Sequence, residues 1–117
     1  MLQHVALEVR REDVDTTIGF WRLLGFEPIE PPASLRERSA WLALAGTQIH
    51  LLFSDDPVAA PSGHAAVVAA DWEAAIARLR EAGYEPEERQ RHWGAARAFV
   101  RDPTGHRIEV MAAAPPG

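Results

Sequence analysis

The sequence repeats itself at a spacing of 58 residues, and this repeat constrains the fold more than any other feature. Six positions that line a helical pattern or end it recur at this spacing: Val14, Ile18, Trp21, Gly25, Phe26 and Pro28 correspond to Trp72, Ile76, Leu79, Gly83, Tyr84 and Pro86. Self-similarity at a fixed period indicates a duplicated structural unit. We therefore expect the second half of the chain to fold as a copy of the first.

Each half contains one amphipathic helix that begins after an aspartate and ends at a glycine. The expected N-caps and terminal glycines are Asp13, Gly25, Asp71 and Gly83. The apolar stripes are the recurring residues Val14, Ile18 and Trp21 in the first helix and Trp72, Ile76 and Leu79 in the second. We expect Trp21 and Trp72 to lie in the core.

Strands surround each helix. A strand with alternating apolar residues precedes it, and three short strands follow it, the last two joined as a hairpin. The hairpin turns are expected near Ala45-Gly46-Thr47 and at Asp102-Pro-Thr-Gly105, which has proline and glycine at favoured turn positions. Each half is therefore predicted to form a βαβββ module.

The two modules predict an α+β fold. We expect a single domain over residues 1–117, with modules at about 1–54 and 64–112 joined by a linker at 55–63 that is rich in proline and small residues. Paired modules of this kind would form a curved mixed sheet, with the helices on its outer face and a trough on the other. Function is then expected in the trough.

Composition excludes several classes of protein. The net charge is −5, and the cations are arginines scattered along the chain, with no lysine, so nucleic-acid binding and Schiff-base chemistry are not expected. There is no cysteine, which excludes disulfides and thiolate chemistry. No apolar run approaches the length of a membrane span, and no signal peptide is recognisable. We expect a cytoplasmic protein without a membrane partner.

Strand periodicity places four side chains that can bind metals on the face away from the helices. They occupy equivalent positions of the repeat: His4 corresponds to His64, and His50 in "TQIHLLF" corresponds to Glu109 in "HRIEVM". Three imidazoles and a carboxylate suit a divalent transition metal such as zinc, iron, nickel, manganese or cobalt. The alternative is that each histidine is an ordinary core or surface residue, as we expect for His92, in a loop beside Trp93, and for His106, after the turn glycine.

The paired modules, together with "LQHVALEV" at the start and "RDPTGHRIEV" at the end, resemble the vicinal oxygen chelate superfamily. That superfamily includes glyoxalase I, bleomycin-resistance proteins, fosfomycin-resistance enzymes and extradiol dioxygenases. The resemblance covers residues 2–112 and implies that His4, His64 and Glu109 are metal ligands. His50 stands where glyoxalase I commonly has glutamate. Glu109 is then the one carboxylate among the ligands left as a base, which weakens the hypothesis of a two-base isomerase.

The resemblance leaves the subfamily open. Fosfomycin thiol transferases have a threonine where this chain has Ala6 and use a lysine that it lacks. Extradiol dioxygenases bind iron with two histidines and a glutamate but are usually longer. Bleomycin-resistance proteins bind a drug without the metal ligands. Many relatives build their sites at a dimer interface, so a homodimer is expected.

The prediction is a metal-dependent enzyme of lyase or isomerase type, in which a metal chelates vicinal oxygens of a small-molecule substrate and Glu109 is the catalytic base. Glu8 is a second candidate base. Side chains expected to contact the substrate are Trp41, Arg97, Phe99 and Met111. The alternatives are a non-catalytic protein that binds a small molecule or antibiotic, and an iron-dependent dioxygenase.

Overall fold

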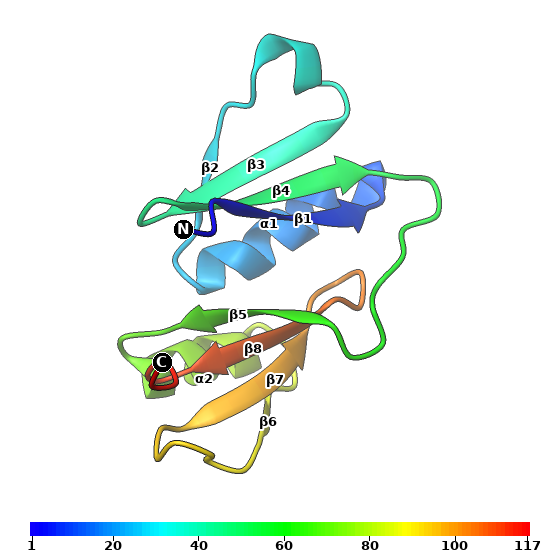
Figure 1. Cartoon of the computed structure of the whole chain (residues 1–117). Coiled ribbons are helices and arrows are strands. Elements are labelled where there is room, and N and C mark those ends of the chain that lie inside the picture. Colours follow the sequence, from blue (N-terminus) through cyan, green and yellow to red (C-terminus); the bar gives the residue numbers. More distant parts are fainter. The chain divides into compact units, whose positions relative to one another are not determined.

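The computed structural model describes all 117 residues, which form two compact units, Met1–Ala59 and Ala60–Gly117. Each unit contains one long helix and a four-stranded mixed sheet, as the repeat predicts (Figure 1). The α+β class is thereby confirmed. No helix has the length and apolar character that crossing a membrane requires.

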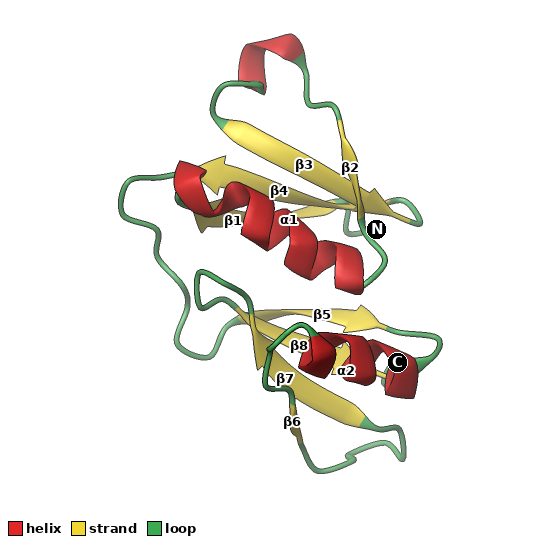
Figure 2. Ribbon diagram, turned by 180° about the vertical axis from the view of Figure 1, so that it is seen from behind, coloured by secondary structure: helices red, strands yellow, loops and turns green.

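Unit 1 follows the predicted order of elements, with two short 3-10 turns added. The elements are β1 (His4–Val9), η1 (Arg11–Asp13), α1 (Val14–Leu23), β2 (Glu27–Ile29), η2 (Ala33–Leu35), β3 (Ser39–Leu44) and β4 (Thr47–Phe53). The strand order is β1-β4-β3-β2, with β1 parallel to β4 and the other pairs antiparallel. The helix α1 covers one face of this sheet (Figure 2).

Unit 2 has the same topology. Its elements are β5 (His64–Val68), α2 (Trp72–Glu81), β6 (Glu87–Glu88), β7 (Arg97–Arg101) and β8 (Arg107–Met111). The strand order is β5-β8-β7-β6, and β5 is parallel to β8. The helix α2 covers one face of this sheet as α1 does in unit 1 (Figure 2).

The strand registers of the two sheets correspond residue by residue at the predicted ligand positions. In unit 1, His50 lies opposite Ala6 of the parallel strand and opposite Trp41 of the antiparallel one. In unit 2, Glu109 lies in the same way opposite Ala66 and Phe99. The equivalence of His50 and Glu109 inferred from the sequence therefore holds in the hydrogen-bonded sheets.

Both helices end at the predicted glycines, but only one begins as predicted. Gly25 and Gly83 each have a φ of 93°, the left-handed conformation that ends a helix without a steric cost for glycine. Asp71 caps α2, since its side chain accepts from the backbone amide of Ala74 at 3.1 Å.

The prediction that the Asp13 side chain caps α1 is wrong. The preceding 3-10 turn places Asp13 at φ −101° and ψ 3°, which is not the extended conformation of a capping residue, and its side chain makes no capping bond. The backbone carbonyl of Asp13 instead accepts from the hydroxyl of Thr17 at 2.8 Å.

The apolar stripe of α1 differs from the prediction. Its buried residues are Thr17, Phe20 and Trp21, while Val14 and Ile18 are only half-buried. Trp21 and Phe20 make an edge-to-face contact with ring centroids 5.5 Å apart. The core of unit 1 is therefore centred on an aromatic cluster that the recurring positions alone do not identify.

In α2 the predicted stripe is buried at Ile76 and Leu79, but Trp72 at the first helical position is half-buried. Its indole N–H donates to the carbonyl of Val110 at 2.9 Å. Trp72 therefore joins the start of the helix to β8 at the edge of the core, in contrast to the fully buried Trp21.

The two hairpin turns form where the sequence predicts them. Ala45 and Gly46 both have positive φ, at 49° and 85°, which is typical of a tight two-residue hairpin turn. At the second turn, one oxygen of the buried Asp102 carboxyl accepts from the amides of Thr104, Gly105 and His106. Burial raises the pKa of Asp102, against the opposing effects of His106 and of these amides. The turn fixes the start of β8, which carries Glu109.

Candidate functional site

The first pair of predicted metal ligands lies on the sheet face of unit 1 away from α1. The imidazole of His50 is stacked between two rings: Trp41 at a centroid distance of 3.8 Å and His4 at 4.0 Å. The ring planes are inclined by only 4° and 16°. His50 is 7% exposed, so its neighbours enclose this polar side chain almost completely.

Glutamine side chains orient both imidazoles. His50 Nε2 lies 2.8 Å from Gln48 Oε1, and His4 Nδ1 lies 2.6 Å from Gln3 Oε1. An amide oxygen only accepts, so each of these ring nitrogens is the donor, and the lone pairs remain on His50 Nδ1 and His4 Nε2. Neither glutamine was predicted as a site residue, although Gln48 lies two residues before His50 on the same strand face.

Burial is the main cause that lowers the pKa of His50 below its ordinary value of 6.5, and the charge of His4 lowers it further. His50 is therefore neutral at pH 7, the state in which an imidazole binds a metal. Because the folded state binds fewer protons here than the unfolded one, the stability that this group contributes is full above pH 6.5 and is lost as the pH falls below it.

Replacing His4 with glutamine should raise the pKa of His50. The substitution removes the charge of His4 but leaves the burial by Trp41 and the sheet, so the new pKa should remain below 6.5. An NMR titration of the His50 ring protons in metal-free protein measures it, with His92→Gln in an exposed loop as the control. A His50 pKa that is unchanged by His4→Gln would show that the two imidazoles do not interact in solution.

The stacked rings of unit 1 cannot both bind one ion as they stand. A metal lies close to the plane of each imidazole that binds it, about 2.0–2.1 Å from the nitrogen. Two nearly parallel rings whose centroids are 4.0 Å apart share no such point. Binding through both residues therefore requires one ring to leave the stack, and His4, at the exposed start of β1, is the one that is free of burial.

The second pair lies on the corresponding face of unit 2. His64 Nε2 is 3.1 Å from Glu109 Oε1, and the other carboxylate oxygen accepts from Arg97 Nε at 2.8 Å. The side chains of Glu109 and Arg97 are 8% and 12% exposed, and that of His64 is 30% exposed. Glu109 is thus a nearly buried carboxylate whose two oxygens face different partners.

The hydrogen-bond partners of His64 suit a cation between it and Glu109. Its Nδ1 is 2.9 Å from the carbonyl of Ser62 and must donate to it. In a neutral imidazole this leaves a lone pair on Nε2, which would face the lone pairs of a carboxylate oxygen. The contact is favourable only if a cation lies between them, either a proton or a metal ion. Two donor atoms bound to one ion at 2.0–2.2 Å would lie about 2.9–3.4 Å apart, and the observed 3.1 Å falls within that range.

Within either unit no third histidine, aspartate or glutamate joins these pairs. Of the residues expected to contact a substrate, Trp41 stacks on His50, and Phe99 makes an edge contact with His64 at 4.9 Å. Arg97 binds Glu109 and the carbonyl of Gln90. Met111 is opposite Arg97 in the register and is 7% exposed.

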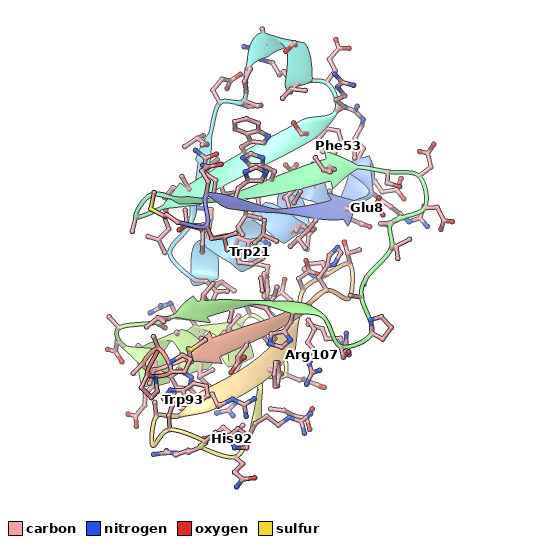
Figure 3. The ribbon with its side chains drawn as sticks, in the orientation of Figure 1. Glu8, Trp21, Phe53, His92, Trp93 and Arg107 are labelled. Carbon is pink, nitrogen blue, oxygen red and sulfur yellow. The ribbon has the colours of Figure 1, made fainter.

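Glu8, the second candidate base, takes part in a backbone contact. Its carboxylate accepts from the amide of Val58 at 2.8 Å and so ties the segment after β4 to the end of β1. Figure 3 shows Glu8 near the end of β1, where the register places it opposite Leu52 of β4. This contact gives Glu8 a structural role.

A cavity of about 430 Å³ opens beside His50 in unit 1. Leu35, Arg38, Ser39, Trp41, His50, Leu52 and Phe53 line it. The volume and the largely apolar, aromatic lining are those of a small-molecule site. Leu52, near the end of β4, is 41% exposed and forms part of this lining.

A family model described as the Glyoxalase/Bleomycin resistance protein/Dioxygenase superfamily matches residues 1–110. Among curated proteins, a "Glyoxylase I 4" from Arabidopsis thaliana is 41% identical over 61 residues, which is 51% of this chain. The match covers only 34% of that relative's own length.

Solved structures share the fold over nearly the whole chain. A glyoxalase family protein from Bacillus anthracis has a TM-score of 0.86 at 24% identity, covering 95% of this chain and 93% of its own. The fosfomycin resistance protein FosX from Listeria monocytogenes has a TM-score of 0.77 at 22% identity, covering 97% and 93%. A variant of FosX was solved with Mn(II) and 1S,2S-dihydroxypropylphosphonic acid, at a TM-score of 0.75 and 22% identity, covering 97% of this chain and 90% of that one.

Proposed function

The chain belongs to the Glyoxalase/Bleomycin resistance protein/Dioxygenase superfamily, and on this premise we propose that it binds a divalent transition metal and acts on a small oxygenated molecule. The proposed ligands are His4, His50, His64 and Glu109, two from each unit. The substrate binds through vicinal oxygens, and the reaction is of lyase or isomerase type. The FosX structure with Mn(II) supports the choice of a divalent metal by analogy of fold.

The observation that carries the proposal is the contact between His64 and Glu109. The imidazole donates its Nδ1 proton to a backbone carbonyl and turns Nε2 toward a carboxylate oxygen at 3.1 Å. A histidine that binds a metal typically donates its other ring N–H to a carbonyl in this way, which fixes its tautomer. The equivalent register positions of His50 and Glu109 support a shared role for the two pairs.

The donor types fit such an ion, and one side chain must move. His50 is neutral and buried, His64 and Glu109 have a ligand-like separation, and His4 must rotate out of its stack on His50. When bound, the metal would act as a Lewis acid that polarises a carbonyl and makes an adjacent C–H more acidic. The proposal therefore includes a change of the His4 side chain on metal binding.

Glu109 is the proposed base. Arg97 holds Oε2 by a charge-assisted hydrogen bond, which fixes the orientation of the carboxylate and leaves Oε1 to face His64 or a ligand. Trp41 and Phe99 lie opposite His50 and Glu109 in the sheets and are the proposed apolar walls for the substrate. Arg97 acts here as a positioning residue, through Glu109.

Metal content tests the proposal directly. We expect protein purified without chelator or nickel resin to contain about one equivalent of a transition metal per site by plasma mass spectrometry, since the ligand set is that of a resident metal. His64→Ala and Glu109→Ala should each lose the metal, while His92→Gln, a change in an exposed loop, should keep it. Protein without metal that also fails to bind added zinc, manganese or iron would contradict the proposal.

Two further measurements refine it. The identity of the metal separates the chemistries, because iron favours dioxygenase assays, whereas zinc, nickel or manganese favour lyase and isomerase substrates. Light scattering gives the number of chains, for which we propose a homodimer. The ratio of metal to chain, combined with the mass of the assembly, then gives the number of metal sites in each assembly.

A non-catalytic binding protein is the second candidate function. The stack of Trp41, His50 and His4, with His50 Nε2 bonded to Gln48, is a satisfied arrangement that needs no metal, and it adjoins the cavity of 430 Å³. In this case Trp41→Ala should weaken binding of an aromatic small molecule in chelator-treated protein. Removal of the metal should leave that binding unchanged.

A further inference from the structure

A second cavity, on unit 2, is lined mainly by charged side chains gathered beside one aromatic ring. It has a volume of about 300 Å³, at the lower end of the range for small-molecule sites. Its charged lining residues are Glu85, Glu87, Arg89, Arg101 and Arg107, with Phe99 beside them. Three arginines against two glutamates leave the lining with one excess positive charge.

Arg107 is the one arginine of this lining whose guanidinium has no polar partner in the chain. Its guanidinium lies 3.7 Å from the centroid of the Phe99 ring, a close cation–π contact, and makes no hydrogen bond or ion pair with the chain. A guanidinium stacked on a ring keeps its plane fixed and its N–H groups pointing outward at the edges. Arg107, at the start of β8, is labelled in Figure 3.

The other arginines around Phe99 already have partners. Arg97, 5.1 Å from the ring, binds Glu109, and Arg89, 5.9 Å away, is 3.4 Å from Glu87. Arg101 donates to the carbonyl of Gly105.

The register adds a further argument. Arg101 lies directly opposite Arg107, and like charges in this position destabilise a sheet unless something neutralises them. An anion bound at Arg107 would do so.

The position of Arg107 relates it to the proposed site. It is opposite His64 in the parallel register and two residues before Glu109 on the same strand. Phe99, on which it stacks, is opposite Glu109. A group bound by Arg107 would therefore lie on the sheet face that carries the proposed base.

We propose that Arg107, held on Phe99, binds a carboxylate of the substrate, so that the protein acts on a small carboxylic acid. The planar fork of N–H groups matches a carboxylate, and the single excess charge of the cavity matches a monoanion. The inference rests on the proposed function in one respect: it takes this face of unit 2 as the place where the substrate binds.

Acetate is the probe for this subsite, in chelator-treated protein. Sodium acetate titrated at constant ionic strength should give saturable NMR shifts at the Arg107 side-chain Nε–H and at the Phe99 amide, and sodium chloride should not. Arg107→Gln should weaken acetate binding about tenfold, because charge-assisted hydrogen bonds are lost. Arg80→Gln removes the same charge from an exposed helical position and should leave the binding unchanged.

Three results would overturn the inference: no saturable acetate binding, equal binding in Arg107→Gln, or tighter binding of inorganic phosphate than of acetate. Arg107→Lys keeps the charge but loses the fork, so it should also bind more weakly; binding equal to the original protein would contradict the role of the fork. Because every titration is done without metal, absence of a metal site leaves this test intact. Failure of acetate binding in turn leaves the metal analysis intact.

Discussion

Replacing Glu109 with alanine should lower the free energy of unfolding by about 3 kcal/mol, even in the presence of a chelator. The substitution leaves the guanidinium of Arg97 without its anion at a position where only 12% of the side chain is exposed. Removing one partner of a buried ion pair costs about 3–5 kcal/mol, because the remaining charge is poorly solvated. Urea unfolding followed by circular dichroism measures the loss, and the chelator removes any contribution from bound metal.

The chain offers a matched control on the same sheet. Glu87 and Arg89 also form an ion pair, at 3.4 Å, but their side chains are 73% and 46% exposed. Glu87→Ala should therefore cost less than about 1 kcal/mol. If both alanine variants had equally small effects, the pair of Arg97 and Glu109 would not be buried in solution, and the account of Arg97 as a positioning residue would fail.

Glu109→Gln separates the effect of Glu109 on stability from its effect on metal binding. The amide keeps an oxygen that can accept from Arg97 but removes the charge that faces His64 and Arg97. We expect a loss of stability smaller than that of alanine, together with a full loss of metal. Stability and metal binding then become separate properties of one side chain, which no alanine variant can show.

The repeat was sufficient to predict the order of elements, because it acts through strong local features. Two glycines at φ 93°, two hairpin turns and alternating strands each depend on neighbouring residues only. The repeat was not sufficient to predict which residues form the core. Phe20 is fully buried, but its counterpart 58 residues later is Arg78, which is exposed, so a stripe built from recurring positions omits it.

The sequence was also sufficient to propose the residues of the candidate site, but it was not sufficient to predict the contacts between them. Period-2 alternation places His50 and Glu109 on the sheet face away from the helices, and the registers agree. Alternation cannot show that Arg97 would take one oxygen of Glu109, or that His50 would stack on Trp41. Those contacts depend on rotamers and on the pairing of strands that are distant in the sequence. They decide whether a metal can bind without rearrangement.

Replacing Trp21 with alanine should lower the free energy of unfolding by about 4 kcal/mol, the largest effect expected of any single change in unit 1. Trp21 has no exposed surface and packs edge-to-face on Phe20 and Phe26, with ring centroids 5.5 Å and 5.3 Å away. Alanine would remove these contacts and leave a cavity under the sheet that carries His4 and His50. Urea unfolding and the NMR spectrum of the β4 amides measure the effect on stability and on the site.

Trp21→Phe tests the reason for that cost. The indole N–H of Trp21 is buried and has no hydrogen-bond partner, so its removal gives up no hydrogen bond and takes away a desolvation penalty. The loss should therefore stay below about 1.5 kcal/mol, from reduced packing alone. A loss as large as that of alanine would mean that the N–H has a partner in solution, such as a buried water.

The second unit gives the comparison that connects this core with the site. Leu79 stands in the place of Trp21 and is also fully buried, with the exposed Arg78 and the half-buried Tyr84 at the places of Phe20 and Phe26. The two sheets thus keep corresponding strand registers, although an aromatic cluster packs against one and a leucine stands in its place against the other. Trp21→Leu should accordingly fall between phenylalanine and alanine in cost, because the aromatic neighbours of unit 1 cannot close around the smaller side chain. If Trp21→Leu were as stable as the original protein, the helix would have moved toward the sheet, and a changed pKa of His50 would report that movement at the site.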